Sequence, residues 1–172
     1  NESQVRDFSG WDGGQLTKHR ILFVCTGNIC RSPTAEGVAR GMASRLGVDK
    51  GFHFDSAGTH GYHVGEPPDS RSQRAASERG YDLSGLRARR VTEFDFVHFD
   101  LLLAMGADHL DLLRRACPRE HAHKLRLFLD YGRDGGGEVP DPYYGGMDGF
   151  ERVLDLVEDA AAGLLRELAL QK

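Results

Sequence analysis

The sequence predicts a single-domain α/β fold: a doubly wound sheet of four parallel strands with helices on both faces. Two observations predict it. Short apolar runs of strand length alternate along the chain with segments whose apolar residues recur at helical spacing. At 172 residues the chain is long enough for one domain with a substantial core and too short for two comfortable ones. Sheets of this kind bind ligands beyond the carboxyl ends of their strands, where we expect the functional site.

The chain opens with a predicted arm, a strand and a helix. Residues 1–19 are rich in polar residues and glycine and show neither the helical nor the strand periodicity of apolar residues. We therefore expect a flexible arm in front of a domain over residues 20–172. Residues 21–24 form a short apolar run typical of a strand. Residues 35–46 carry apolar side chains at helical spacing. Strand, loop and helix therefore make up the first structural unit.

The strand and helix pattern repeats in the middle of the chain. Residues 52–56 indicate a second strand, and residues 67–80 a helix that begins behind two prolines. Residues 101–105 are apolar throughout, as expected of a strand buried on both faces. Residues 107–116 predict a helix that ends before a proline, and residues 124–129 predict the fourth strand.

The last helix has the clearest pattern. Over residues 150–168 the apolar side chains fall on one stripe, and charged side chains occupy the opposite face. We expect this helix to cover one face of the sheet. The stripe consists of Phe150, Val153, Leu154, Val157, Ala161, Leu164, Leu165 and Leu168.

Composition excludes several classes of protein. With 22 Lys and Arg against 26 Asp and Glu, the formal charge is −4, and no basic block suits a nucleic-acid partner. The apolar runs are shorter than the ~18 residues that span a bilayer, and no leader opens the sequence. Three cysteines, two of them within six positions, fit a reducing compartment better than a disulfide framework. We therefore expect a soluble, cytoplasmic protein that neither binds nucleic acid nor enters a membrane.

The loop after the first strand predicts an anion site. Gly27 and Asn28 are residue types that accept positive φ, so the segment from Cys25 to Arg31 can curl with its backbone N–H groups pointing inward. Ser32 is a suitable N-cap and Pro33 a suitable first helical residue, which brings the positive end of the helix dipole to the same hollow. A tetrahedral dianion would fit there.

Cys25 and Arg31 give this hollow its chemistry. N–H groups and a guanidinium both favour the thiolate, so we expect Cys25 to act as a nucleophile at neutral pH. The planar fork of Arg31 can bind two phosphoryl oxygens at once. The alternative for a cysteine at a strand end is a small buried hydrophobe. No Gly-Lys-Ser/Thr follows, which disfavours nucleotide binding, and the eight histidines show no metal-ligand spacing.

Four motifs together resemble one known family. "VCTGNICRSP" carries a Cys-x5-Arg-Ser loop, "DSAGT" and "PPD" follow it, and "DPYYGG" stands near the C-terminus. In this order and spacing they are similar to the low-molecular-weight protein tyrosine phosphatases over about residues 20 to 170. The resemblance implies hydrolysis of phosphotyrosine in a phosphoprotein, a bacterial tyrosine kinase as an expected partner, and inhibition by phosphate or vanadate. It implies no metal and no cofactor.

The resemblance also implies roles for individual residues. Asp141 is the general acid, aimed by the restricted backbone before Pro142. Ser32 donates a hydrogen bond to the Cys25 sulfur, and Asn28 braces the loop. The remaining expectations concern three sets of residues. The phosphate-binding loop comprises Thr26, Gly27, Asn28, Ile29, Cys30, Arg31 and Ser32, and the cleft walls are Tyr143 and Tyr144, with Tyr62 and Phe52 as further candidates. Independently of the resemblance, Cys30 either packs beneath the loop or is a redox partner of Cys25, because an accessible thiolate is easily oxidised.

Several alternatives stay open. An arsenate reductase of the same fold would need a relay of further cysteines, and Cys117 alone does not form such a pair. A phosphoarginine phosphatase would be expected to carry Thr where Ile29 stands. A sugar-transport phosphocarrier passes its phosphoryl group on, so it would not need Arg31 and Asp141, which serve to hydrolyse a phosphocysteine. A non-catalytic phosphoprotein-binding module would not need Cys25, Arg31 and Asp141 together. Glu36 is interpreted as a surface or loop-bracing residue, and His60 and His63 as solvated loop residues.

Overall fold

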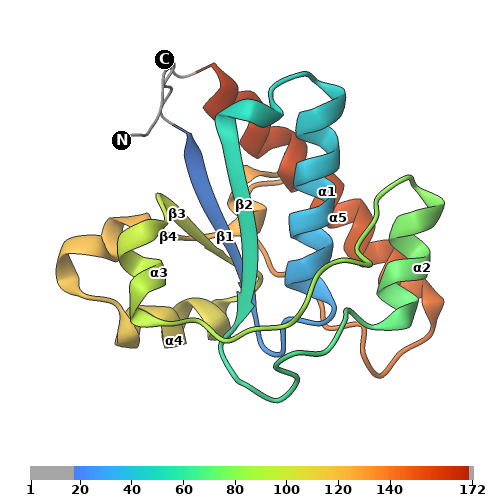
Figure 1. The fold of residues 1–172 in the computed structure, drawn as a ribbon, viewed down its shortest axis with the longest axis horizontal. Coiled ribbons are helices and arrows are strands. Elements are labelled where there is room, and N and C mark those ends of the chain that lie inside the picture. Colours follow the sequence, from blue (N-terminus) through green and yellow to red (C-terminus); the bar gives the residue numbers. More distant parts are fainter. Residues whose placement is uncertain (1–17, 171–172) are drawn as a thin grey trace, which may run out of the picture.

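The computed structural model describes residues 18–170, and all four strands of its sheet are parallel. The strands are β1 (His19–Cys25), β2 (Phe52–Gly58), β3 (Leu101–Ala104) and β4 (Leu125–Leu127), in the order β2-β1-β3-β4 (Figure 1). The predicted four-stranded parallel sheet is therefore confirmed. The predicted arm falls almost entirely on residues 1–17, which lie outside the described residues, and His19 already belongs to β1.

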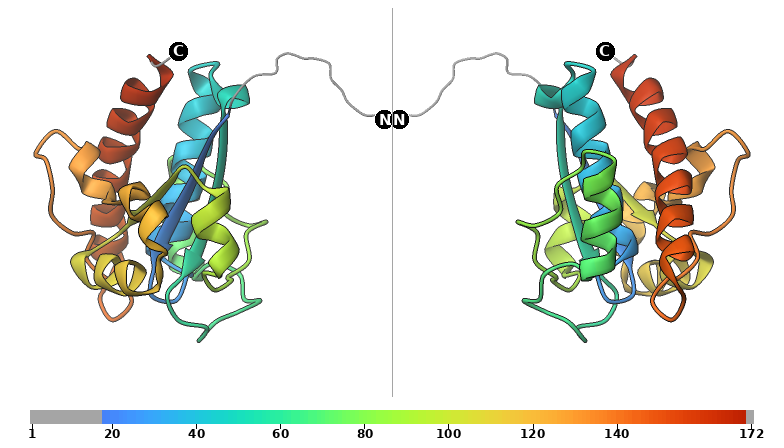
Figure 2. Two further views of the ribbon diagram at one scale, coloured as in Figure 1. Left: turned by 90° about the vertical axis from the view of Figure 1, so that its left-hand side faces the viewer. Right: turned by 90° about the vertical axis from the view of Figure 1, so that its right-hand side faces the viewer.

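Helices cover both faces of the sheet (Figures 1 and 2). On one face α1 (Arg31–Arg45) packs against β1 and β2 and against α5 (Met147–Ala169), with α2 (Ser70–Glu78) beside α5. On the other face lie α3 (Glu93–His98) and α4 (Ala107–Ala116). Short 3₁₀ helices span Asp49–Gly51, Arg119–Lys124 and Phe128–Tyr131.

The central strand β1 is buried on both faces, which explains its continuous apolar run. Ile21 and Phe23 point into the core shared with α1 and α5, whereas Leu22 and Val24 join the cluster under α3 and α4. All four side chains are fully buried. Alternate residues of a strand face opposite sides, so a strand between two helical layers must be apolar at every position.

Two helix assignments differ from the sequence prediction. Helix α1 begins at Arg31 with Cys30 as its N-cap, so Ser32 lies inside the first turn and does not cap it. Helix α3 was not predicted, because six residues are too few for a recognisable period. The local signal for it is a capping box, in which Thr92 and Asp95 exchange hydrogen bonds with each other's backbone N–H groups.

The carboxyl ends of the strands meet at one edge of the molecule. Cys25 pairs with Gly58 there, and Ala104 of β3 ends one position before Cys25 in register. The segment before α5 returns to the same edge, where Val139 N donates to Met105 O. Among residues 18–170 no helix has both the length and the apolar character needed to cross a membrane.

Candidate active site

The Cys25–Arg31 loop curls at the end of β1 and leads directly into α1. Asn28 holds a left-handed conformation with φ of 60°, the one positive φ at a non-glycine residue among residues 18–170. Such a conformation is unfavourable for most side chains and less so for asparagine. The loop therefore has to be held in place by its neighbours.

A buried chain of hydrogen bonds holds it. The Asn28 amide nitrogen donates to Ser32 Oγ at 2.8 Å and Ser56 Oγ at 3.0 Å, while its oxygen accepts from Arg89 N at 2.9 Å. Ser56 Oγ in turn donates to Glu36 at 2.7 Å. Glu36 is buried, so the loop-bracing interpretation fits its position and the surface interpretation is wrong. Burial raises the pKa of Glu36, and the hydrogen bond from Ser56 and the nearby Arg40 oppose that shift.

The same chain ends at the Cys25 sulfur. Ser32 Oγ lies 3.0 Å from Cys25 Sγ and accepts the hydrogen bond from Asn28, which leaves the Ser32 hydroxyl proton free to point at the sulfur. The Ser32 backbone N–H also faces Sγ at 3.4 Å. Both donors belong to the first turn of a 15-residue helix, so the positive end of that helix lies at the sulfur. Ser32 therefore serves the sulfur instead of capping the helix.

The DSAGT motif supports the loop from below. Ser56 belongs to the bracing chain, and Gly58 lies so close to the loop that a Cβ atom there would stand 2.6 Å from Thr26 O. Thr59 N and His60 N then donate to Cys25 O and Thr26 O. Only glycine permits this approach of two backbones.

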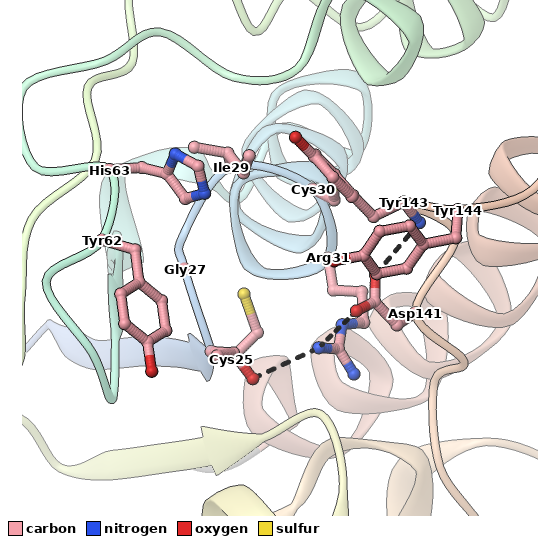
Figure 3. Close-up of a pocket in the computed structure, with 11 residues that line it drawn as sticks. Cys25, Gly27, Ile29, Cys30, Arg31, Tyr62, His63, Asp141, Tyr143 and Tyr144 are labelled. Carbon is pink, nitrogen blue, oxygen red and sulfur yellow. Dashed lines mark hydrogen bonds and ion pairs between the residues drawn. The ribbon is translucent and has the colours of Figure 1, made fainter.

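Arg31 connects the loop with the segment that carries Asp141. Its guanidinium lies 3.8 Å from the Asp141 carboxylate and donates to Val139 O at 3.3 Å. The Arg31 side chain is only 11% exposed, whereas that of Asp141 is 50% exposed. Figure 3 shows both side chains on one side of the cavity, with the Cys25 sulfur facing its centre.

Loop and walls enclose a cavity of about 390 Å³. Tyr62 and His63 come from the segment after β2, and Tyr143 and Tyr144 stand across the cavity from them (Figure 3). The Tyr143 and Tyr144 rings are 5.0 Å apart and nearly perpendicular. The other lining residues are Cys25, Thr26, Gly27, Ile29, Cys30, Arg31 and Asp141; Asn28 and Ser32 lie behind the loop.

The prediction that Phe52 walls the cleft is wrong. Phe52 begins β2 and pairs with His19, whereas the site lies where Cys25 pairs with Gly58, at the other end of the two strands. Its ring is buried and stacks on Phe54. A strand rises about 3.3 Å per residue, so the first and last of the seven residues of β2 lie about 20 Å apart.

Two histidines of the site were not foreseen. His63 lines the cavity and lies over Gly27, where a Cβ atom would stand 2.9 Å from its ring, so the interpretation of His63 as a merely solvated loop residue is wrong. His109 of α4 is 1% exposed, and its Nε2 lies 2.8 Å from Thr26 Oγ1 in the loop. Burial and the positive charge of Arg31 lower the pKa of His109 to about 4. His109, Leu110 and Leu113 share the buried face of α4, and that helical spacing was the available signal.

The site is suited to an anion and not to a metal ion. Within residues 18–170 no three His, Cys, Asp or Glu side chains come together as a metal site would need. The cavity instead combines the cysteine sulfur, towards which the Ser32 backbone N–H points, with a guanidinium and a carboxyl group. These are the groups that covalent transfer of a phosphoryl group requires.

Comparisons with known proteins agree with this geometry. The sequence model of the family described as low molecular weight phosphotyrosine protein phosphatase matches residues 20–172. A low molecular weight protein-tyrosine-phosphatase of Streptomyces coelicolor is 46% identical over 151 residues, covering 86% of this chain and 92% of the relative.

Two solved structures are similar as well. A protein tyrosine phosphatase of Entamoeba histolytica matches with a TM-score of 0.85 and 40% identity, over 88% of this chain and 97% of its own. Wzb of Vibrio vulnificus, in complex with benzylphosphonate, matches with a TM-score of 0.78 and 28% identity, over 87% and 98%. The chain therefore belongs to the low molecular weight phosphotyrosine protein phosphatases, and it is a cysteine-dependent protein-tyrosine phosphatase.

Proposed function

We propose that Cys25, Arg31 and Asp141 hydrolyse phosphotyrosine through a phosphocysteine intermediate formed on Cys25. The observation that carries this proposal is their convergence on one cavity from the end of β1, the start of α1 and the segment before α5. Residues 20–172 form the phosphatase domain in this proposal, in agreement with the range that the family model matches.

In the first step the Cys25 thiolate attacks phosphorus and the bond to the phenolic oxygen breaks. Asp141 gives its proton to the departing phenolate, which would otherwise be a poor leaving group. Arg31 binds two of the equatorial oxygens, and the N–H groups of the loop from Thr26 to Ser32 neutralise the charge that they carry.

In the second step water attacks the phosphocysteine. Asp141, now a carboxylate, takes a proton from that water as the P–S bond breaks. The sulfur leaves as a thiolate, and the Ser32 hydroxyl, 3.0 Å away, stabilises it. No metal takes part in either step, because the loop and Arg31 supply the positive charge.

The cavity walls favour an aromatic phosphate ester. Cys25 is buried at the bottom, and Tyr62, Tyr143 and Tyr144 offer aromatic faces above it. A phenyl ester can reach the sulfur, whereas the shorter phosphoserine cannot. The benzylphosphonate bound to the similar Wzb structure, whose aryl ring is one methylene group away from its phosphorus, supports the same choice.

The test compares phosphotyrosine, phosphoserine and phosphoarginine peptides of one sequence. We expect kcat/KM for phosphotyrosine to exceed the other two by at least about 100-fold, because only this ester both reaches the sulfur and contacts the rings. Comparable values for phosphoserine, or a preference for phosphoarginine, would contradict the substrate assignment. Arsenate reduction measured with the same preparation tests the remaining alternative of this fold.

The partner and the compartment are part of the proposal. A phosphotyrosine-containing protein is the substrate, and a bacterial tyrosine kinase is the partner class that it suggests. Inorganic phosphate and vanadate inhibit by occupying the loop, and the protein works in the cytoplasm. Competition by phosphate against p-nitrophenyl phosphate tests the occupancy of the loop directly.

Cys30 is proposed to protect Cys25 during oxidation. Peroxide converts the Cys25 thiolate to a sulfenic acid, and condensation with the Cys30 thiol would form a disulfide and release water. Burial raises the pKa of Cys30 to about 12, so Cys30 enters this reaction as a thiol. We expect thiol reductants to restore the phosphatase activity of the peroxide-treated enzyme. The activity of the Cys30→Ser variant should recover far less after the same treatment. Mass spectra with Cys25 as sulfinic acid and Cys30 free would rule the role out.

A further inference from the structure

A second hollow, of about 470 Å³, lies next to the catalytic cavity on the α3 and α4 side of the sheet. Its apolar lining comes from Val91, from Phe96 of α3 and from Leu112, Leu113 and Ala116 of α4, and Thr59, Thr92 and Glu93 add polar groups. His60 and Arg90 form part of its rim. None of the steps proposed above uses this hollow.

One thin wall separates the two hollows. His60 lines the second hollow and Tyr62 lines the catalytic cavity, and their rings stack with centroids 5.1 Å apart and planes 6° from parallel. Between them is Gly61, where a Cβ atom would stand 3.8 Å from Arg90 Cδ. Tyr62 is among the more exposed aromatic residues, so the top of this wall is open to solvent.

Helix α4 also connects the two hollows. His109 contacts Thr26 of the phosphate loop, and Leu112, Leu113 and Ala116 follow at three, four and seven positions along the same helix face. With a rise of 1.5 Å per residue, the lining residues stand about 4.5 to 10.5 Å along the axis from the loop contact. The second hollow therefore begins one helical turn from the catalytic loop.

We propose that this hollow binds a large apolar side chain of the substrate, such as Leu, Met or Phe, two to four positions from the phosphotyrosine. A phosphotyrosine that enters between Tyr62 and the pair Tyr143 and Tyr144 must leave its peptide backbone across the rim (Figure 3). An extended chain advances about 3.3 Å per residue, so two to four residues cover about 7 to 13 Å. This length is comparable with the about 4.5 to 10.5 Å along the α4 axis that separates the lining residues from the His109 contact with the loop.

The occupant follows from continuity with the catalytic cavity. The proposal rests on the proposed function, because only a substrate anchored through its phosphate brings a neighbouring side chain to this place. A different apolar groove, called the control groove below, is lined by Met42, Leu46 and Leu165 and lies near the start of β2 at the opposite end of the sheet. An anchored peptide cannot reach it, which makes it a matched control.

The experiment measures kcat/KM for phosphotyrosine peptides in which one Leu is moved from four positions before the phosphotyrosine to four positions after it. Leu112→Gln and Ala116→Trp alter the second hollow, the first by a polar group and the second by filling it. Leu46→Gln makes the same change as Leu112→Gln in the control groove; Leu46 is 65% and Leu112 37% exposed. p-Nitrophenyl phosphate, which has no peptide, reports the catalytic cavity alone.

We expect Leu at one position, two to four residues from the phosphotyrosine, to raise kcat/KM about tenfold over the Leu-free peptide. Both variants of the second hollow remove this gain and leave p-nitrophenyl phosphate unchanged, while Leu46→Gln keeps it. Absence of a gain at every position, or a gain that survives both variants, would overturn the subsite and leave the proposed function intact. Lack of Cys25-dependent hydrolysis of p-nitrophenyl phosphate would overturn the proposed function itself.

Discussion

The two sides of the catalytic cavity are built differently. The loop with Cys25 is buried, and a chain of hydrogen bonds runs from Glu36 through Ser56, Asn28 and Ser32 to the sulfur. The segment with Asp141 has few such contacts. Asp141 accepts a hydrogen bond from Tyr143 N at 3.1 Å and faces Arg31 at 3.8 Å, and Tyr144 is 93% exposed.

This difference assigns separate tasks to the two sides. The nucleophile and the anion site are organised before a substrate arrives, so the loop need not reorganise when charge develops on the phosphoryl oxygens. The acid and the tyrosines are held through Arg31, a local turn and Arg71, whose guanidinium lies 5.4 Å from the centre of the Tyr143 ring and donates to Gly145 O. The substrate ring completes their surroundings. Changes on the loop side should therefore alter stability and catalysis together, and changes on the other side catalysis alone.

Cys25→Ser has the largest expected effect. A serine hydroxyl at this position lacks the nucleophilicity of a thiolate, so we expect no measurable turnover of phosphotyrosine or p-nitrophenyl phosphate. Phosphate and vanadate should still bind, because the N–H groups and Arg31 are unchanged. Steady-state assays and calorimetric titration with phosphate measure the two properties. Substantial activity of this variant would end the phosphocysteine mechanism.

Asp141→Ala should affect catalysis without affecting stability. We expect kcat for phenolic esters to fall by about 10²- to 10⁴-fold, the usual contribution of a general acid. The fall should be smaller for p-nitrophenyl phosphate, whose leaving group needs less protonation. The free energy of unfolding should change by less than about 0.5 kcal/mol, because the side chain is half exposed. Equal losses for both esters would count against the role of a proton donor.

Asn28→Ala tests the braced side. It removes three hydrogen bonds, two of them buried, and places alanine at a φ of 60°, so we expect about 2 to 4 kcal/mol less stability together with lower kcat. Asn28→Gly is the matched control, since glycine lacks the amide as alanine does but accepts the positive φ. Urea unfolding of the two variants separates backbone strain from hydrogen bonding. A stable, active Asn28→Ala protein would show that the loop keeps its conformation without the hydrogen bonds of the Asn28 side chain.

His109 should make the loop side sensitive to acid. Its pKa is lowered to about 4, so between pH 6.5 and 4 the unfolded chain binds more protons than the folded one. The contribution of neutral His109 to the free energy of unfolding is therefore fully present above pH 6.5 and is lost as the pH falls towards 4. At pH 5 the loss amounts to about 2 kcal/mol relative to pH 7. We expect His109→Asn, which cannot titrate, to show a flatter profile in urea unfolding at both pH values; an unchanged profile would assign the acid sensitivity elsewhere.

Much of the fold could be predicted because its signals are local. A strand buried between two helical layers is apolar at every position, and residues 21–24 have that pattern. Helix α4 was predicted with the bounds that the structure has, since its apolar spacing ends at Pro118. Helix α3 was missed, and Ser32 was misplaced as an N-cap because its hydroxyl serves a partner outside the helix.

The sequence by itself determined where the curled loop and the proposed nucleophile lie. Cysteine, glycine, asparagine, arginine and serine within eight positions predict a curled backbone, a thiol at its start and a bidentate cation, because each of these properties arises within a few residues. Resemblance to a known family added Asp141, which composition alone would have left as an ordinary surface turn.

Only the tertiary structure decided what surrounds the loop. The packing of α1 on β2 brings Glu36 and Ser56 to Asn28, and α4 brings His109 to Thr26. Phe52 shows the converse, because the direction of β2 carries this aromatic residue to the far end of the sheet. The physical reason is that such contacts join residues tens of positions apart, and their geometry depends on strand order, register and helix packing, which no short stretch of sequence contains.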